Sequence, residues 1–180
     1  MASTEGFGSM RHLASRFAGA LSPAGPAASD EAWAEAALLD GERSLWRRMS
    51  GPDRRHAVGV ARDTIELLGG DADRPVVAAA LLHDVGKVEA SIGTFARVLV
   101  TLLAMAAGRD RLVQWSRRGG SSARQRIGLY LTHDRLGAEL LERAGSDRLT
   151  VAWAGEHHLA PERWSVDAKV GAALKAADGD

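Results

Sequence analysis

Residues 74–87 read Arg-Pro-Val-Val-Ala-Ala-Ala-Leu-Leu-His-Asp-Val-Gly-Lys. The stretch from Val76 to Val85 is almost continuously apolar, and a helix that is apolar on all sides is buried inside a protein. His83 and Asp84 nevertheless stand within it, and an unpaired buried charge is costly. A metal ion is the simplest partner for such a pair. This segment therefore predicts a buried helix that carries metal ligands.

Helical spacing of apolar residues continues on both sides of this stretch, without strand alternation or an internal repeat. The expected helices cover residues 31–49, 53–69, 76–85, 94–107, 109–118, 124–144, 147–158 and 165–178. Asp40-Gly41 is a candidate break within the first. The apolar run Val98–Ala107 is shorter than the roughly 20 residues that a bilayer span needs, so it predicts another buried helix. The chain is thus expected to form an all-α, compact bundle of about 6–8 helices.

The length of 180 residues fits a single domain. Residues 1–28 are rich in Ala, Gly, Ser and Pro, which predicts a flexible N-terminal tail with at most a turn or two of helix around residues 10–20. Residues 29–180 are then the helical domain. No convincing secretory signal is present, so a cytoplasmic location is expected. The 23 basic residues balance the 23 acidic ones, and this neutral total gives no indication of nucleic-acid binding.

The chain contains no cysteine. Disulfides, zinc–thiolate sites and cysteine nucleophiles are therefore excluded. A metal would have to be held by imidazole and carboxylate groups, which suit iron or manganese and also zinc or nickel.

Five of the six histidines fall into an ordered pattern with two aspartates. Several separate helices thereby each offer one or two ligand-type side chains, as in helical metalloproteins whose ligands converge in a bundle core. The members are His56, His83, Asp84, His133, His157, His158 and Asp178. On a helix, Lys87 would share a face with His83 and Asp84, where a substrate phosphate could lie.

The order of these segments, centred on Leu81-Leu82-His83-Asp84-Val85-Gly86-Lys87, resembles the HD superfamily of metal-dependent phosphohydrolases over roughly residues 50–180. The resemblance extends to the branch that includes HD-GYP and related cyclic di-nucleotide phosphodiesterases and the bacterial HD hydrolases of diadenosine tetraphosphate. The Gly-Tyr-Pro signature is absent, because Leu159-Ala160-Pro161-Glu162 follows the double histidine.

The resemblance implies a compact HD domain with two divalent transition metals, iron or manganese first. His56, His83 and Asp178 would hold one metal, Asp84 would bridge both, and His157 would hold the second. His133 matches the family's third histidine segment. His158 would be a further ligand, a phosphate contact or a surface residue. The implied activity is hydrolysis of a nucleotide or related phosphodiester or phosphoanhydride by a metal-bridging hydroxide, with Asp84 and Lys87 as catalytic residues.

Two other functions stay open at this stage. One is a mixed-valence di-iron oxygenase, since some HD relatives resemble this ligand set. The other is a non-catalytic nucleotide- or metal-binding module. The sequence sets no oligomeric state.

A basic segment separates Lys87 from His133. Between Arg109 and Arg126, six arginines stand against the single acid Asp110, a local charge of +5. The segment is either a solvated helix face or a lid that grips a polyanionic substrate through guanidinium–phosphate pairs. In the second case the expected substrate-binding residues are Arg117, Arg118 and Arg124.

Overall fold

The computed structural model describes residues 24–90, 92, 94–118 and 121–179, and these residues form helices and no strand. The all-α fold is therefore confirmed. The described part of the chain contains ten α-helices, which is more than the 6–8 expected, because two of the expected helices are each divided in two. The α-helices are α2 (Ala28–Ala37), α3 (Asp40–Trp46), α4 (Gly51–Leu67), α5 (Arg74–Leu82), α6 (Thr94–Ala107), α7 (Arg109–Arg117), α8 (Ser122–Leu131), α9 (His133–Arg143), α10 (Arg148–Glu156) and α11 (Ala168–Asp178). Two 3₁₀ turns, η1 (Val85–Glu89) and η2 (Pro161–Arg163), lie between them.

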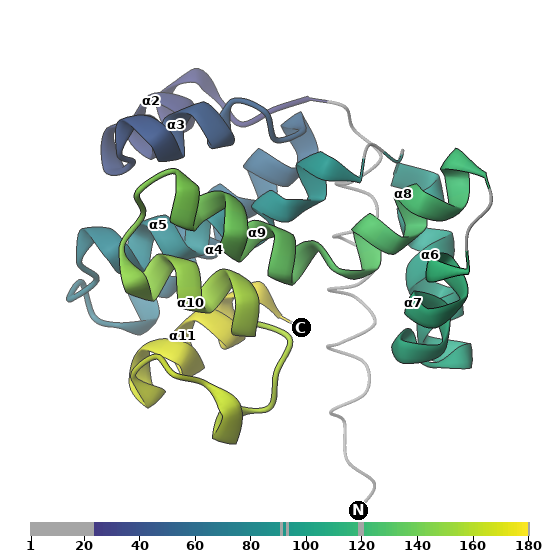
Figure 1. The fold of residues 1–180 in the computed structure, drawn as a ribbon. Coiled ribbons are helices and arrows are strands. Elements are labelled where there is room, and N and C mark those ends of the chain that lie inside the picture. Colours follow the sequence, from purple (N-terminus) through teal and green to yellow (C-terminus); the bar gives the residue numbers. More distant parts are fainter. Residues whose placement is uncertain (1–23, 91, 93, 119–120, 180) are drawn as a thin grey trace, which may run out of the picture.

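The bundle is built around α5 (Figure 1). Helix α4 packs on one side of α5 and α10 on another, α9 packs on both α10 and η1, and α11 packs on α4. Helices α2 and α3 also contact α5. The break predicted at Asp40-Gly41 is present, two residues earlier than expected, at Leu38-Leu39.

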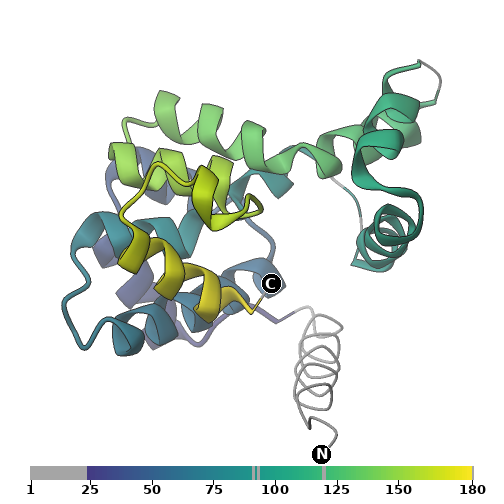
Figure 2. The ribbon, with the colours of Figure 1, turned by 90° about the horizontal axis from the view of Figure 1, so that it is seen from below.

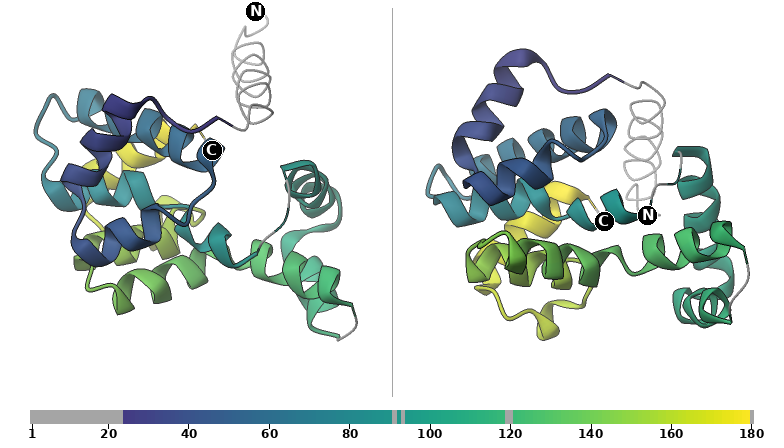
Figure 3. Two further views of the ribbon diagram at one scale, coloured as in Figure 1. Left: turned by 90° about the horizontal axis from the view of Figure 1, so that it is seen from above. Right: turned by 45° about the horizontal axis from the view of Figure 1, so that its top comes forward.

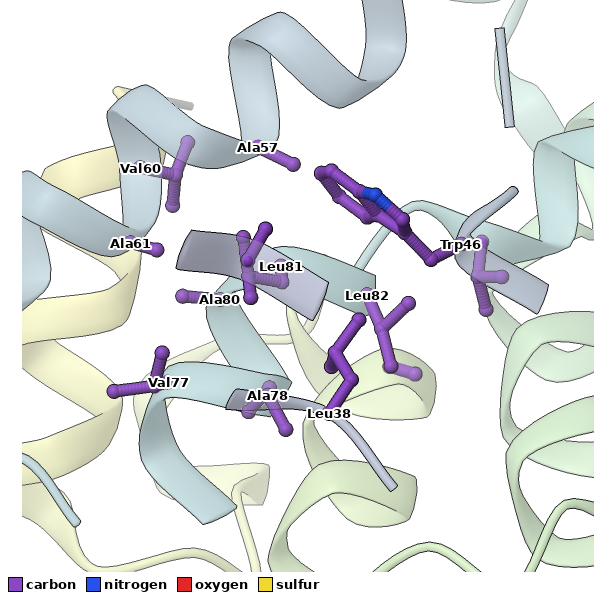
Figure 4. Packing of buried hydrophobic residues seen from close by; sticks show 14 of the residues in the cluster. Leu38, Trp46, Ala57, Val60, Ala61, Val77, Ala78, Ala80, Leu81 and Leu82 are labelled. Carbon is purple, nitrogen blue, oxygen red and sulfur yellow. The ribbon is translucent and has the colours of Figure 1, made fainter. Parts of the chain in front are cut away.

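The central position of α5 follows from its sequence. Every residue from Val76 to Leu82 is buried, as an apolar helix surface requires. The Asp73 carboxylate accepts a hydrogen bond from the Val76 backbone N–H and so caps the start of the helix. Leu81 and Leu82 pack with Leu38 of the α2–α3 junction and with Trp46 at the end of α3 (Figure 4).

The prediction of a single helix over residues 124–144 is wrong, because this stretch forms two helices, α8 and α9. It is interrupted at Thr132, whose φ of −117° and ψ of 21° lie outside the helical region. The Thr132 hydroxyl donates to the Gly128 carbonyl 2.9 Å away, and such back-bonding by threonine bends helices. The break directs α9 along the bundle and sets His133 at its first turn.

Helices α6, α7 and α8 form a lobe, residues 94–131, that projects from the bundle (Figures 2 and 3). The expectation that Val98–Ala107 is buried is wrong for much of that stretch, since Leu99 is 59% and Leu102 57% exposed. The reason is that α6 packs mainly against α7, so its other side has no neighbour among the described residues. Within those residues, no helix combines the length and the apolar content needed to cross a bilayer.

The predicted flexible tail, residues 1–28, and the possible helical turns at 10–20 fall largely or wholly outside the described residues. Helix α2 begins at Ala28, next to the expected start of the helical domain at residue 29. The division of the chain at this point stays a prediction.

Candidate metal centre

The seven side chains proposed as metal ligands come together at one end of the bundle, although they lie up to 122 positions apart in the chain. Helix α4 supplies one, the α5–η1 junction two, α9 one, the end of α10 two and α11 one. In that order they are His56, His83, Asp84, His133, His157, His158 and Asp178.

The first group consists of His56, His83 and Asp178. Nε2 of His56 lies 3.0 Å from Oδ1 of Asp178, and Nε2 of His83 lies 3.6 Å from the same oxygen. One ligand atom of each residue lies within 4.8 Å of the others, so a single ion could contact all three. Asp178 is only 5% exposed, so its place near the chain end does not leave it in solvent.

The second group consists of His133, His157 and His158, whose ring nitrogens also lie within 4.8 Å of one another. Nε2 of His133 is 3.3 Å from Nε2 of His158. His133 and His157 are buried, whereas His158 lies at the exposed rim. The three donors are imidazole nitrogens, which are suitable ligands for a transition metal.

Asp84 lies between the two groups. Its Oδ2 is 3.4 Å from Nε2 of His83, and its Oδ1 is 3.1 Å from Nε2 of His133 and 3.9 Å from Nε2 of His157. The two carboxylate oxygens thus face different groups. A carboxylate in this position can bridge two ions.

Three of the imidazoles are oriented in the same way. Nδ1 of His83, His133 and His157 lies 2.9, 2.7 and 3.0 Å from the carbonyl oxygen three residues earlier. Each of these carbonyls belongs to the last turn of a helix, where carbonyls lack helical partners. An Nδ1–H that donates to such a carbonyl fixes the ring and leaves the Nε2 lone pair pointing into the centre, as in histidine ligands of metals.

Nε2 of His157 is buried and has no hydrogen-bond partner. A buried polar atom without a partner is rare in folded proteins and calls for an explanation. A cation that accepts the lone pair provides one, so the residues present fit a metal ion.

Helix dipoles favour the same conclusion. Helices α5 and α10 end one residue before a ligand, α11 ends at the ligand Asp178, and α8 ends two residues before His133, where α9 begins. The C-terminal end of a helix carries a partial negative charge that stabilises nearby cations.

Two glycines permit η1 and α9 to approach closely enough to form the centre. A Cβ built on Gly86 would lie 1.9 Å from the His133 carbonyl oxygen and 2.6 Å from the Gly137 nitrogen. A Cβ on Gly137 would lie 3.2 Å from the Gly86 nitrogen. The backbones on which Asp84 and His133 reside are therefore in direct contact.

Lys87 reaches the centre by a route different from the one expected. Helix α5 ends at Leu82 instead of continuing to residue 85, and Lys87 lies in the 3₁₀ turn η1. Side chains three residues apart eclipse one another in a 3₁₀ helix, so the Lys87 ammonium still contacts Oδ2 of Asp84. Burial disfavours the ammonium, but the Asp84 carboxylate outweighs it and keeps the pKa of Lys87 above its usual range.

Two buried histidines of the centre, His83 and His157, differ in charge in the metal-free protein. Burial opposes protonation of His83, but the Asp84 and Asp178 carboxylates outweigh it and raise its pKa to about 9. Burial, together with the charge of His83, lowers the pKa of His157 to about 4. Burial by itself would raise the pKa of Asp84, yet Lys87 and His83 hold it well below its usual range.

These pKa values predict how metal binding depends on pH. His83 is protonated at neutral pH and must lose that proton to coordinate, whereas His157 is already neutral. The affinity of the metal-free protein for Mn²⁺ is expected to rise by up to about tenfold per pH unit between about pH 7 and pH 8.5, because binding displaces one proton from His83. Calorimetric titration across this range measures it. A pH-independent affinity would contradict a protonated His83 as a ligand.

The expected substrate-binding arginines lie away from the ligands along α7 and α8. Arg124 lies in the first turn of α8, seven positions before that helix ends, about 10 Å at 1.5 Å per residue, and its guanidinium lies 4.3 Å from the centre of the Trp115 ring. Arg117 and Arg118 are exposed at the end of α7. The structure does not bring these three to the ligand set, and their contact with substrate stays a prediction.

Sequence reasoning missed two residues that position His133. Arg109 donates to the Leu131 carbonyl and forms an ion pair of 2.8 Å with Asp134, so it joins α7 to the α8–α9 junction. Tyr130 supplies the carbonyl that orients His133, and its ring stacks on that histidine with centroids 5.8 Å apart. The sequence feature that could have pointed to this junction is the second His–Asp dipeptide, His133-Asp134.

The chain has no detectable match among protein-family models, curated proteins or solved structures.

Proposed function

We propose that this protein is a metal-dependent phosphohydrolase of the HD type, acting on a nucleotide or another small phosphate ester or anhydride. The observation that carries the proposal is the position of Asp84, whose two oxygens face separate ligand groups. Two ions held by these groups would supply an activated water for attack at phosphorus. Such a pair lowers the pKa of the water and clamps the oxygens of an in-line displacement at phosphorus.

The proposed ligands are assigned to two ions. His56, His83 and Asp178 would hold one ion, and His133, His157 and His158 the other, with Asp84 shared. His158, in the second group, is exposed and would be accessible to a substrate. In the first group, His83 and Asp178 are buried and His56 is partly exposed.

Lys87 is the candidate for phosphate recognition. Its ammonium stays charged and lies against Asp84, the carboxylate that the two ions would share. A fixed positive charge there can pair with a phosphate oxygen and stabilise the charge that develops during attack. This is the second argument for phosphate chemistry.

Iron or manganese are the proposed ions, with zinc or nickel as substitutes, because the donors are imidazoles and carboxylates without sulfur. We place the reaction in the cytoplasm, where nucleotides are abundant. The remaining expected contacts, Arg117, Arg118 and Arg124, would act only on a substrate long enough to reach the lobe.

The activity is tested with bis-p-nitrophenyl phosphate and added Mn²⁺ or Fe²⁺. We expect turnover by the wild type, and a fall on the order of 10²-fold in kcat/KM for Lys87→Met, because the variant loses one electrostatic stabiliser of the transition state. Lys169→Met, which changes an exposed lysine of α11, is the matched control and should behave as the wild type.

Three results would contradict the proposal. One is absence of turnover with every metal, and another is equal activity of Lys87→Met and the wild type. The third is turnover that requires oxygen, which would instead indicate a di-iron oxygenase. Loss of folding on metal removal with no activity on phosphate substrates would favour a binding module.

A further inference from the structure

The lobe formed by residues 94–131 carries an apolar stripe that the bundle does not use. Leu99, Leu102 and Leu103 on α6 are 59%, 57% and 47% exposed, and their spacing places them on one face of the helix. Of the six large hydrophobic residues that are exposed in the described chain, these three and Trp115 belong to the lobe. Isolated exposed leucines are ordinary, but a contiguous group indicates an interaction surface.

The packed side of α6 is a different face. Val100 is only 3% exposed, and the Thr101 hydroxyl lies 3.2 Å from the Tyr130 hydroxyl of α8. The leucine stripe is therefore not the contact that holds the lobe together. It is free to meet a partner without unfolding α6.

Charge is strongly segregated onto the same lobe. Seven arginines stand against one aspartate in residues 94–131, a net charge of +6, whereas the whole chain is neutral and the remainder is thus −6. Arg111, Arg117, Arg118 and Arg126 are exposed on α7 and α8. A partner of the lobe must accept both apolar side chains and many guanidinium groups.

We propose that the lobe binds the surface of a membrane that contains anionic lipids. The lobe combines leucines on one face of α6 with exposed arginines and Trp115 on α7 and α8. This combination of apolar, aromatic and basic side chains is typical of segments that lie in the headgroup region. Anionic headgroups attract arginines near the surface, and the acyl boundary accepts the leucines. A second copy of the lobe would set +6 against +6, and a nucleic acid would leave the leucines in water.

This inference goes beyond the proposed hydrolysis and does not depend on it, because it uses no metal ligand. The two parts are nevertheless connected, since α8 leads directly into His133 through Thr132. Binding would hold the centre near a lipid surface.

The test is co-sedimentation of the full chain with phosphatidylcholine vesicles that contain or lack phosphatidylserine, at low and high salt. We expect binding only to the anionic vesicles, weakened by salt. The variant Leu99→Ser/Leu102→Ser/Leu103→Ser should lose at least about tenfold in vesicle affinity. The variant Arg111→Gln/Arg126→Gln should lose about tenfold.

Matched controls lie outside the lobe. Leu39→Ser/Leu67→Ser changes leucines that are 38% and 55% exposed, and Arg135→Gln/Arg143→Gln changes arginines whose side chains are 69% and 74% exposed. Both should bind as the wild type. Thermal unfolding followed by circular dichroism verifies that every variant is folded, and a variant that fails is replaced by the single change Leu102→Ser.

Several outcomes would overturn the proposal. Absence of binding to anionic vesicles at low salt is one. Equal binding by the leucine variant and the wild type is another, because it would leave a purely electrostatic attraction. A dimer that the leucine variant loses, seen by light scattering without vesicle binding, would assign the stripe to a second copy of the chain.

Discussion

Asp84→Asn lowers metal-supported hydrolysis of bis-p-nitrophenyl phosphate on the order of 10³-fold, if the proposed centre is catalytic. The reason is that an amide offers one oxygen and no charge, so it cannot bridge two ions. Among the residues that the structure describes, Asp84 is the carboxylate that faces both ligand groups. Metal analysis of the purified variant should accordingly show no more than one tightly bound ion per chain.

The control for this change is Asp134→Asn, which alters the acid of the other His–Asp dipeptide. Asp134 faces no ligand group, and without its carboxylate Arg109 keeps both hydrogen bonds to the Leu131 carbonyl that hold the α8–α9 junction. The change should therefore alter turnover by less than about fivefold. Circular dichroism must show both variants folded. Undiminished turnover by Asp84→Asn, or equal losses in the two variants, would remove Asp84 from the mechanism.

Gly86→Ala is expected to destabilise the protein by about 3 kcal/mol. The added Cβ would lie 1.9 Å from the His133 carbonyl oxygen and 2.6 Å from the backbone nitrogen of Gly137. Neither atom belongs to a flexible side chain, so η1 and α9 must separate. Because Asp84 precedes η1 and His133 begins α9, the same shift should abolish binding of the second ion.

Urea unfolding measures the first effect and metal analysis the second. Gly59→Ala is the matched control: Gly59 is exposed in the middle of α4, and a Cβ there would have no neighbour within 4 Å. Alanine favours a helix over glycine, so this variant should be more stable than the wild type by about 0.5–1 kcal/mol. A Gly86→Ala protein with wild-type stability would show that the contact between η1 and α9 is not needed.

The buried helix at the centre could be predicted because α5 is apolar on every side. Its residues leave no choice of face, and they fix where His83 and Asp84 lie relative to the core. The order of histidines then indicated which other segments should meet them. The seven side chains do meet, although their role as metal ligands stays a prediction.

The division at Thr132 could not be predicted, because neither glycine nor proline marks it. The break depends on a threonine hydroxyl that bonds to a carbonyl four residues earlier, an interaction that threonine makes in some helices and not in others. The orientation of His133 depends on that break, since its Nδ1 bonds to the Tyr130 carbonyl left at the end of α8.

The exposure of α6 could not be predicted from the sequence either. An apolar stretch of this length fits a buried helix and an unpartnered one equally well, because periodicity reports which residues are apolar and not what covers them. The position of the lobe beside the bundle shows that α6 is the unpartnered kind of helix (Figure 2).

The central claim is that two ions lie on either side of Asp84, and anomalous diffraction from manganese-loaded crystals tests it most directly. We expect two peaks about 3.5–4 Å apart, one contacted by His56, His83 and Asp178, and the other by His133, His157 and His158, with an Asp84 oxygen on each. A single peak, no peak, or two peaks without Asp84 between them would contradict the claim.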